Sequence, residues 1–192
     1  MESRRRLTAS VLPETGWTVL AMDFGGKGMG LALLLKLIHV FLGFWLVAGL
    51  LGRWVTLAQA GRSTDVRITS SLVQLAGRFE GVMVIPGSAA VVVAGLLTAW
   101  AEGQPILGVV QGSNTNWLLV SLLLFLTLFP IIRWVFLPRG RQFGLALDGA
   151  LKQGEVTPEL RAAFNDSAVR IAHIYELIVI FVIIVLMVTK PF

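Results

Sequence analysis

Four long apolar stretches dominate the sequence and limit what the chain can fold into. They cover residues 29–52, 82–100, 117–136 and 168–189. Crossing the hydrocarbon core of a bilayer, about 30 Å thick, takes roughly 20 apolar residues in a helix. Because lipid offers no hydrogen-bond partners to the backbone, isolated apolar stretches of this kind cross as α-helices. The sequence therefore predicts an all-α integral membrane bundle of four transmembrane helices over residues 29–192.

The composition supports this fold class and excludes several kinds of site. The apolar fraction is 56% and the charged fraction 14%, whereas soluble domains carry about 25% charged residues. The chain has no cysteine, which excludes disulfides, thiolate metal sites and iron–sulfur clusters. In a membrane protein the net charge of +5 mostly records orientation. Lipid is therefore an expected partner and nucleic acid is not.

The first 28 residues differ from the rest in their mixed polarity. Pro13, Glu14 and Asp23 interrupt them, so the unbroken apolar region of a secretory signal is missing. We interpret residues 1–28 as a retained N-terminal tail that is partly interfacial, with the stretch 17–24 at the membrane surface.

The positive charges in the connections between the spans indicate an orientation. The first connection contains Arg53, Arg62, Arg67 and Arg78. The third connection contains Arg139, Arg141, Lys152 and Arg161. The second connection, residues 101–116, has no lysine or arginine. By the positive-inside rule the two arginine-bearing connections are cytoplasmic, which gives an N-out/C-out topology. The arginines at positions 4–6 argue the other way, but they stand more than 20 residues from the first span, where the rule weakens.

Local patterns predict two further helices and the packing faces of the bundle. Residues 66–80 have the apolar face of an amphipathic helix leading into the second span. Thr157 followed by Pro158 is typical of an N-cap and a first helical residue, so a short cytoplasmic helix should begin there. Small residues are expected where helices pack closely. They are Gly43, Ala48, Gly49, Gly87, Ala89 and Gly95.

Four ionisable residues within the predicted spans are the functional candidates, because an ionisable group in a span costs on the order of 2–3 kcal/mol. They are Lys36, His39, His173 and Glu176. Two interpretations stay open. In the first, the lysine snorkels, His39 makes an interhelical hydrogen bond, and His173 with Glu176 forms a buried polar contact. In the second, His39 and His173 are metal ligands that bind haem b, and Lys36 or Glu176 serves as a propionate partner, a group behind the ligand or a proton relay.

The predicted depths of the two histidines bear on a shared haem. His39 falls ten residues below the outer boundary of its span, about 15 Å down, and His173 falls about 22 Å down. Two axial nitrogens on one iron stand about 4 Å apart, because metal–nitrogen bonds are about 2 Å long. A haem shared by both histidines is therefore disfavoured, and a haem on His39 alone fits at least as well.

Other chemistries lack their sequence patterns. The chain has no H-E-x-x-H, G-x-S-x-G, Walker or Rossmann motif, and no paired carboxylates in its spans. A soft copper(I) path has few ligands, since cysteine is absent and only four methionines follow the initiator. Electron, proton or porphyrin chemistry remains open because a bound cofactor can supply the reactivity.

Several motifs together resemble one family. They are K-L-I-H-V and W-L-V-A-G-L-L in the first span, I-P-G and G-L-L-T-A-W in the second, then L-P-R-G-R, T-P-E-L-R-A and the closing L-M-V-T-K-P-F. Over residues 31–192 the chain resembles an uncharacterised bacterial family of four-helix predicted integral membrane proteins. That family is in turn similar to copper-resistance D-like proteins and to the membrane-bound, haem-dependent protoporphyrinogen oxidase. The resemblance implies a multi-pass protein of the bacterial inner membrane and associates His39 with haem. Trp45 departs from the pattern, since it follows Lys36 by nine residues instead of ten.

Two functions of different kinds are compatible with these patterns. The first is a non-enzymatic membrane subunit or accessory protein of a larger complex, with other membrane subunits or a second copy as partners. The second is a haem b-binding redox or porphyrin-handling protein that uses His39. No residue is expected to be catalytic.

Overall fold

The computed structural model describes residues 27–191, and the side chains from residue 30 onward. Within that range the chain is helical and without strands. Four helical segments are long and apolar enough to cross a membrane, which confirms the predicted fold class. Their bounds are Gly30–Arg62, Val66–Ala101, Trp117–Gln153 and Pro158–Thr189. Residues 1–26 of the expected tail lie outside the described residues.

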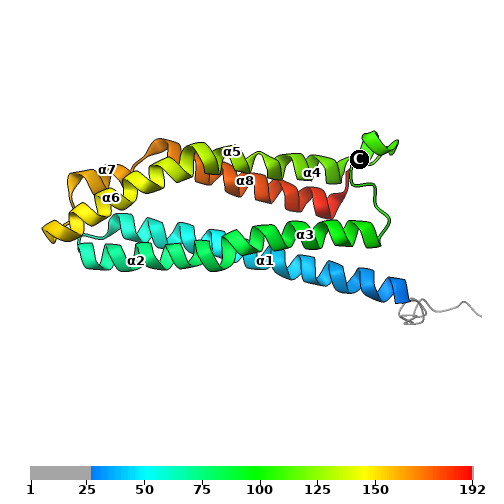
Figure 1. The fold of residues 1–192 in the computed structure, drawn as a ribbon, viewed down its shortest axis with the longest axis horizontal. Helices are drawn as coiled ribbons and strands as arrows, with labels where there is room; N and C mark the ends of the chain where they lie inside the picture. Colours follow the sequence, from blue (N-terminus) through cyan, green and yellow to red (C-terminus); the bar gives the residue numbers. More distant parts are fainter. Residues whose placement is uncertain (1–26, 192) are drawn as a thin grey trace, which may run out of the picture.

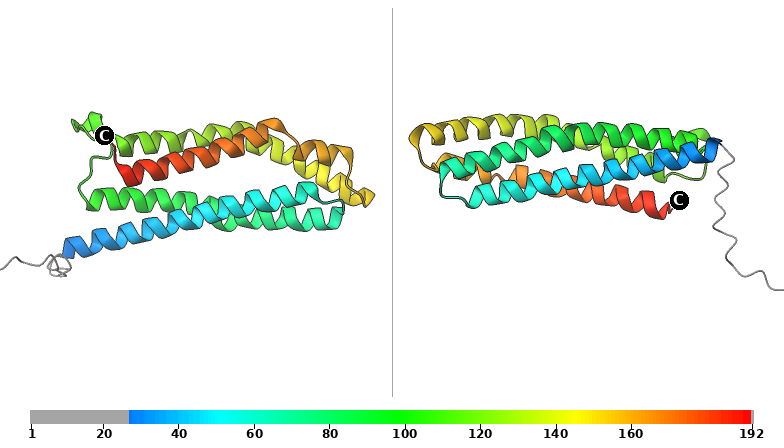
Figure 2. Two further views of the ribbon diagram at one scale, coloured as in Figure 1. Left: turned by 180° about the vertical axis from the view of Figure 1, so that it is seen from behind. Right: turned by 90° about the horizontal axis from the view of Figure 1, so that it is seen from below.

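The segments form two antiparallel pairs that lie against each other along their length (Figures 1 and 2). The first hairpin pairs α1 (Lys27–Arg62) with a long segment of three parts, α2 (Val66–Phe79), η2 (Glu80–Val84) and α3 (Ile85–Ala101). In the second hairpin, one segment consists of α4 (Trp117–Leu126), α5 (Leu128–Ile131), η4 (Ile132–Phe136) and α6 (Leu137–Gln153). It pairs with α7 (Pro158–Phe164) and α8 (Ser167–Thr189). A short helix, η3 (Gly108–Gln111), lies in the chain segment that connects the two hairpins. The start of α1 and the end of α8 lie at the same end of the molecule (Figure 1).

Polar groups divide the bundle into a membrane-spanning part and an extension. At one end Lys36 pairs with Glu102, and at the other Arg53 pairs with Glu80 and Glu176. Lys36 and Arg53 are separated by about 26 Å of helix, close to the thickness of a hydrocarbon core. We call these two levels the Lys36 end and the Arg53 end. Exposed tryptophans, which favour membrane interfaces, lie near both levels. Trp100 lies at the Lys36 end, and Trp54 and Trp134 lie at the Arg53 end, whereas Trp45, which is also exposed, lies between the two levels.

Beyond the Arg53 end the helices continue as an extension with a small core of its own. Its centre is Leu160, which is fully buried beside Val66 and Ala150. Phe143 and Phe164 pack against this cluster, and their two rings meet edge to face with centroids 4.9 Å apart. The first and third connections are therefore largely helical. Arg53, Arg62, Arg139, Arg141 and Lys152, which the sequence placed in the connections between the spans, lie on helices α1 and α6.

Side-chain caps fix where the helices of the extension begin. Asp65 accepts hydrogen bonds from the backbone N–H groups of Arg67 and Ile68, and α2 follows. The Thr157 hydroxyl accepts one from Leu160 N–H at 3.3 Å, with Pro158 as the first residue of α7. Both helices expected from the sequence, over residues 66–80 and from Pro158, are confirmed.

Two prolines set the irregular turns in the long segments. In η2 the Ile85 N–H donates to Glu80 O, and in η4 the Leu137 N–H donates to Ile132 O, so each turn is wider than an α-helical one. The second residue after each turn is a proline, Pro86 or Pro138. Proline has no N–H to donate and its ring clashes with the carbonyl four residues back. The wide turn accommodates that clash, and such π-turns are frequent at functional sites.

Small residues allow close packing at some of the predicted positions. A Cβ on Gly49 would lie 2.6 Å from Met83 Cβ, and one on Gly87 would lie 3.3 Å from Trp45 Cδ1. A Cβ on Gly95 would lie 2.8 Å from His39 Cε1. The prediction was wrong for Ala48 and Ala89, which are exposed, and a Cβ on Gly43 would meet no atom within 4 Å. Residue size alone does not encode which side of a helix is exposed.

Candidate functional site

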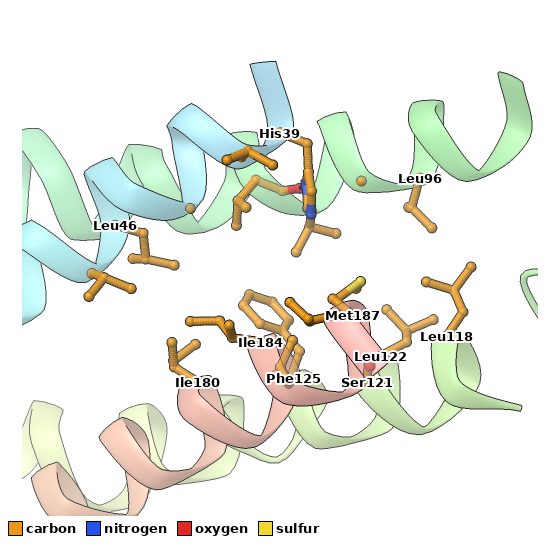
Figure 3. A pocket seen from close by; sticks show the side chains of 18 of the residues that line it. His39, Leu46, Leu96, Leu118, Ser121, Leu122, Phe125, Ile180, Ile184 and Met187 are labelled. Carbon is orange, nitrogen blue, oxygen red and sulfur yellow. Dashed lines mark hydrogen bonds between the residues drawn. The ribbon is translucent and has the colours of Figure 1, made fainter. Parts of the chain in front are cut away.

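A cavity of about 390 Å³ lies between the two hairpins in the half of the bundle nearest the Lys36 end (Figure 3). α1 and α3 form one wall, and α4 and α8 form the other. Leu46, Leu50 and Val84 close it toward the Arg53 end. Ala99, Trp117 and Leu118 close it toward the Lys36 end, with Met187 packed against them. The lining is apolar apart from the polar side chains of His39 and Ser121. Met187 adds a thioether sulfur.

His39 lies on the α1 wall with its ring directed into the cavity (Figure 3). Its Nδ1 is 2.9 Å from the carbonyl oxygen of Val91 on α3. A carbonyl can only accept, so Nδ1 carries the proton and donates it. The neutral imidazole then has its lone pair on Nε2, the nitrogen at the cavity side of the ring. The backbone of α3 thus fixes both the tautomer and the direction of this side chain.

Gly95 provides the space for the His39 ring. A Cβ at this position would lie 2.8 Å from His39 Cε1 and 3.1 Å from Nδ1. Even alanine would therefore push the ring away from Val91. The glycine and the carbonyl lie four residues apart on α3, so they face the histidine from one side of that helix.

Lys36 lies one turn before His39 on α1, but its Nζ contacts Glu102 Oε1 at 2.5 Å. Glu102 follows the last residue of α3, so this pair links the end of α3 to the interior of α1. The Lys36 side chain is 49% exposed. Its ammonium therefore lies at the boundary of the bundle, near the cavity but outside its lining.

Arg53 organises a second polar cluster at the Arg53 end. Its guanidinium donates through Nη1 to Glu80 on η2 and through Nη2 to Glu176 on α8. Nη2 also lies 3.2 Å from His173 Nδ1. The Arg53 and Glu176 side chains are only 10% and 11% exposed. One arginine thus joins both hairpins through carboxylates that come from different segments.

His173 serves as a hydrogen-bond acceptor in this cluster. A guanidinium only donates, so His173 Nδ1 accepts with its lone pair and the ring is neutral in this geometry. Phe136, the last residue of η4, stacks on the ring with centroids 4.7 Å apart. The same phenyl ring lies 5.8 Å from Arg53 Cζ. His173 is thereby held by Arg53 and Phe136, and its Nδ1 lone pair is already used.

The structure brings together some of the four residues singled out from the sequence and separates others. His173 and Glu176 share the Arg53 cluster, with His173 Nδ1 3.6 Å from Glu176 Oε2. His39 lies elsewhere, because Arg53 follows it on α1 by about 21 Å of helix. The two histidines therefore cannot bind one iron. The difference in depth of about 7 Å expected from the sequence also argues against a shared haem. Within residues 27–191 no three side chains of His, Asp or Glu gather as a metal site.

Arg53 and Glu80 are functional candidates that the sequence analysis did not single out. Arg53 directly follows the predicted first span and Glu80 precedes the second. The sequence therefore placed both in a connection, where charged residues are ordinary. The pair of Arg53 and Glu80 joins positions 27 residues apart, and the pair of Arg53 and Glu176 joins positions 123 residues apart. One available signal was the proline shortly after Glu80, which predicts an irregular turn beside it.

Comparison with known proteins places most of the chain in one family. A family model described as predicted integral membrane protein (DUF2269) matches residues 33–191. No curated protein matches the chain, and no solved structure does.

Proposed function

The chain belongs to the family of predicted integral membrane proteins DUF2269, and on this premise we propose that its cavity binds haem b, with His39 Nε2 as an axial ligand of the iron. The observation that carries the proposal is the hydrogen bond from His39 Nδ1 to Val91 O at 2.9 Å. A histidine that binds a metal almost always donates its other ring N–H to a carbonyl or carboxylate. His39 has this arrangement and keeps its free nitrogen on the cavity side.

The cavity has the size of a ligand pocket and an apolar lining. Its volume of about 390 Å³ falls within the range of about 300–1,000 Å³ typical of ligand pockets. Met187 comes from α8 on the wall facing His39 (Figure 3), and thioether sulfur is a known second axial ligand of haem iron. Lys36, one turn from His39, is the nearest cation on α1, and it would have to exchange its ion pair with Glu102 for a propionate. A bound haem would supply one-electron chemistry, while the chain holds it and excludes water.

Absorption spectroscopy tests the proposal. Wild-type protein expressed with added haem precursor and purified in detergent should carry a Soret band. His39→Ala should lose it, and His173→Ala, the matched histidine control, should keep it. Gly95→Val should weaken it as well, because the added side chain displaces the His39 ring. A colourless wild type, or equal bands in His39→Ala and His173→Ala, would contradict haem binding at this site.

A second candidate is a non-enzymatic subunit or accessory role in a larger membrane complex. It is supported by the exposure of α1. Only 6% of its most apolar 18-residue window is buried, against 17–28% in the other three segments. Phe41 and Phe44 on this helix are 71% and 70% exposed. The two functions are compatible, because the cavity and the outer face of α1 are different surfaces.

Site-specific cross-linking tests the subunit role. A photoreactive residue at Phe41 should give one defined cross-linked species in native membranes, either with another subunit or with a second copy. The same group at Phe181 of α8, which is 65% exposed, is the matched control. Cross-links to lipid alone from both positions would contradict a subunit role.

The orientation, the membrane and the wider relationship belong to the same proposal. We infer that both termini lie outside and that the Arg53 end faces the cytoplasm of a bacterial inner membrane. The arginines of the extension support this orientation. The spacing of Lys36 and His39 supports a relation to copper-resistance D-like proteins and to the haem-dependent protoporphyrinogen oxidase.

A further inference from the structure

A second cavity, of about 400 Å³, lies at the Arg53 end between α1, α6 and α8. It is separate from the cavity of His39 and shares no lining residue with it. Trp54, Phe136 and Phe143 supply apolar walls. Arg139 of α6 and Arg170 of α8 supply cations. A pocket with an apolar part and two guanidinium groups suits an amphipathic anion.

The charges of this cavity are unbalanced. Asp166 neutralises Arg139 by a direct ion pair. Arg170 has no ion pair among the residues that the structure describes, and it is exposed. His173 also lines the cavity and is neutral where it accepts from Arg53. The lining therefore carries one uncompensated positive charge, which complements an anion.

The depth of the cavity matches that of lipid headgroups. It begins at the level of His173 and Phe136, at the edge of the apolar spans, and continues about 10 Å along α8 and α6 into the extension. The headgroup region adds roughly 5–8 Å to each side of the hydrocarbon core. Basic pockets between transmembrane helices at this depth bind anionic headgroups.

We propose that this cavity binds one anionic glycerophospholipid of the leaflet at the Arg53 end. Arg170 and Arg139 contact the phosphate, and acyl chain carbons lie against the aromatic walls. The lipid would then fill the space between the extension and the bilayer, where α1 of the first hairpin meets α6 and α8 of the second.

Native mass spectrometry of the purified full chain tests the assignment. The probes are phosphatidylglycerol, phosphatidylcholine and water-soluble glycerol phosphate. One phosphatidylglycerol per chain should be retained in preference to phosphatidylcholine. Each arginine near the headgroup contributes roughly fivefold in affinity, so Arg139→Gln with Arg170→Gln should weaken retention by roughly 25-fold. The matched control, Arg67→Gln with Arg161→Gln, changes two exposed arginines outside the cavity and should retain the lipid.

A cavity-filling variant makes the test independent of charge. A Cβ on Gly140 meets no atom within 4 Å, so Gly140→Leu should enter the cavity without disturbing its walls and should abolish retention. If the double arginine variant does not fold, Arg170→Gln alone should give a roughly fivefold loss. Equal retention of the two lipids, or no loss in Arg170→Gln and Gly140→Leu, would overturn the proposal. Glycerol phosphate binding as tightly as phosphatidylglycerol would also overturn it, by showing a site for free phosphate.

Discussion

Arg53 of α1 and Glu176 of α8 form a buried ion pair across the interface of the two hairpins, although 123 residues separate them in the sequence. Glu80 and His173 complete the contacts of the guanidinium. Removing one partner of a buried pair leaves the other charge without compensation. The cluster therefore stabilises a particular alignment of the hairpins, at the level where the apolar spans end.

Replacing Arg53 should destabilise the bundle strongly. Arg53→Leu leaves the carboxylates of Glu80 and Glu176 unpaired, and we expect a loss of about 3–5 kcal/mol in the free energy of unfolding. The measurement is denaturant unfolding in mixed micelles followed by circular dichroism. Arg62→Leu on the same helix is the control and should change the free energy by no more than about 0.5 kcal/mol, because Arg62 is exposed. Similar losses in both variants would contradict the role of the cluster.

The close approach of α1 to η2 should make Gly49 sensitive to a single methyl group. Its Cβ would lie 2.6 Å from Met83 Cβ, so Gly49→Ala forces the two helices apart. We expect a loss of about 1–3 kcal/mol. Gly43→Ala is the matched control, since nothing lies within 4 Å of its Cβ. There alanine should be neutral or stabilising by up to about 1 kcal/mol. The measurement is thermal unfolding of the two variants in parallel. An equal change in Tm for Gly49→Ala and Gly43→Ala would be inconsistent with this packing.

The small core of the extension should depend on Leu160. Leu160→Ala leaves a cavity at a fully buried position, with an expected loss of about 2–5 kcal/mol. Limited proteolysis should then cleave α6 and α7 before the membrane-spanning part. Leu151→Ala, at an exposed position on α6, should change the rate of cleavage little. Protection of both variants as in the wild type would show that the extension does not rest on this core.

The apolar spans could be predicted from the sequence because their signal is local and long. The N-caps at Asp65 and Thr157 are also local, and Thr157 was recognised. The length of the helices was not predicted, since mixed polar and apolar residues after Arg53 and after Phe136 follow no membrane pattern. These residues are helical because Val66, Ala150 and Leu160 pack together from distant segments.

For the candidate site, the sequence identified His39 but not what holds it. Its acceptor is the backbone carbonyl of Val91, which any residue at that position would offer. The role of Gly95 depends on which face of α3 meets α1, and the sequence predicted only that it packs. Arg53 was assigned by a rule about charge and sidedness, which does not consider ion pairs between helices.

The absence of cysteine makes the orientation easy to test. Asn114→Cys lies in the connection of residues 101–116, and Glu155→Cys lies between α6 and α7; both positions are exposed. With both termini outside, an impermeant maleimide should label Asn114→Cys on intact spheroplasts and label Glu155→Cys only after permeabilisation. The reverse pattern would invert the proposed topology.

Haem titration of the purified protein tests the central claim most directly. Haem added to apo wild type in detergent should develop a Soret band that saturates at one haem per chain. His39→Ala should show no saturable change, and His173→Ala should titrate as the wild type does. Saturation of His39→Ala at the same stoichiometry, or no saturable binding by the wild type, would contradict a haem site built on His39.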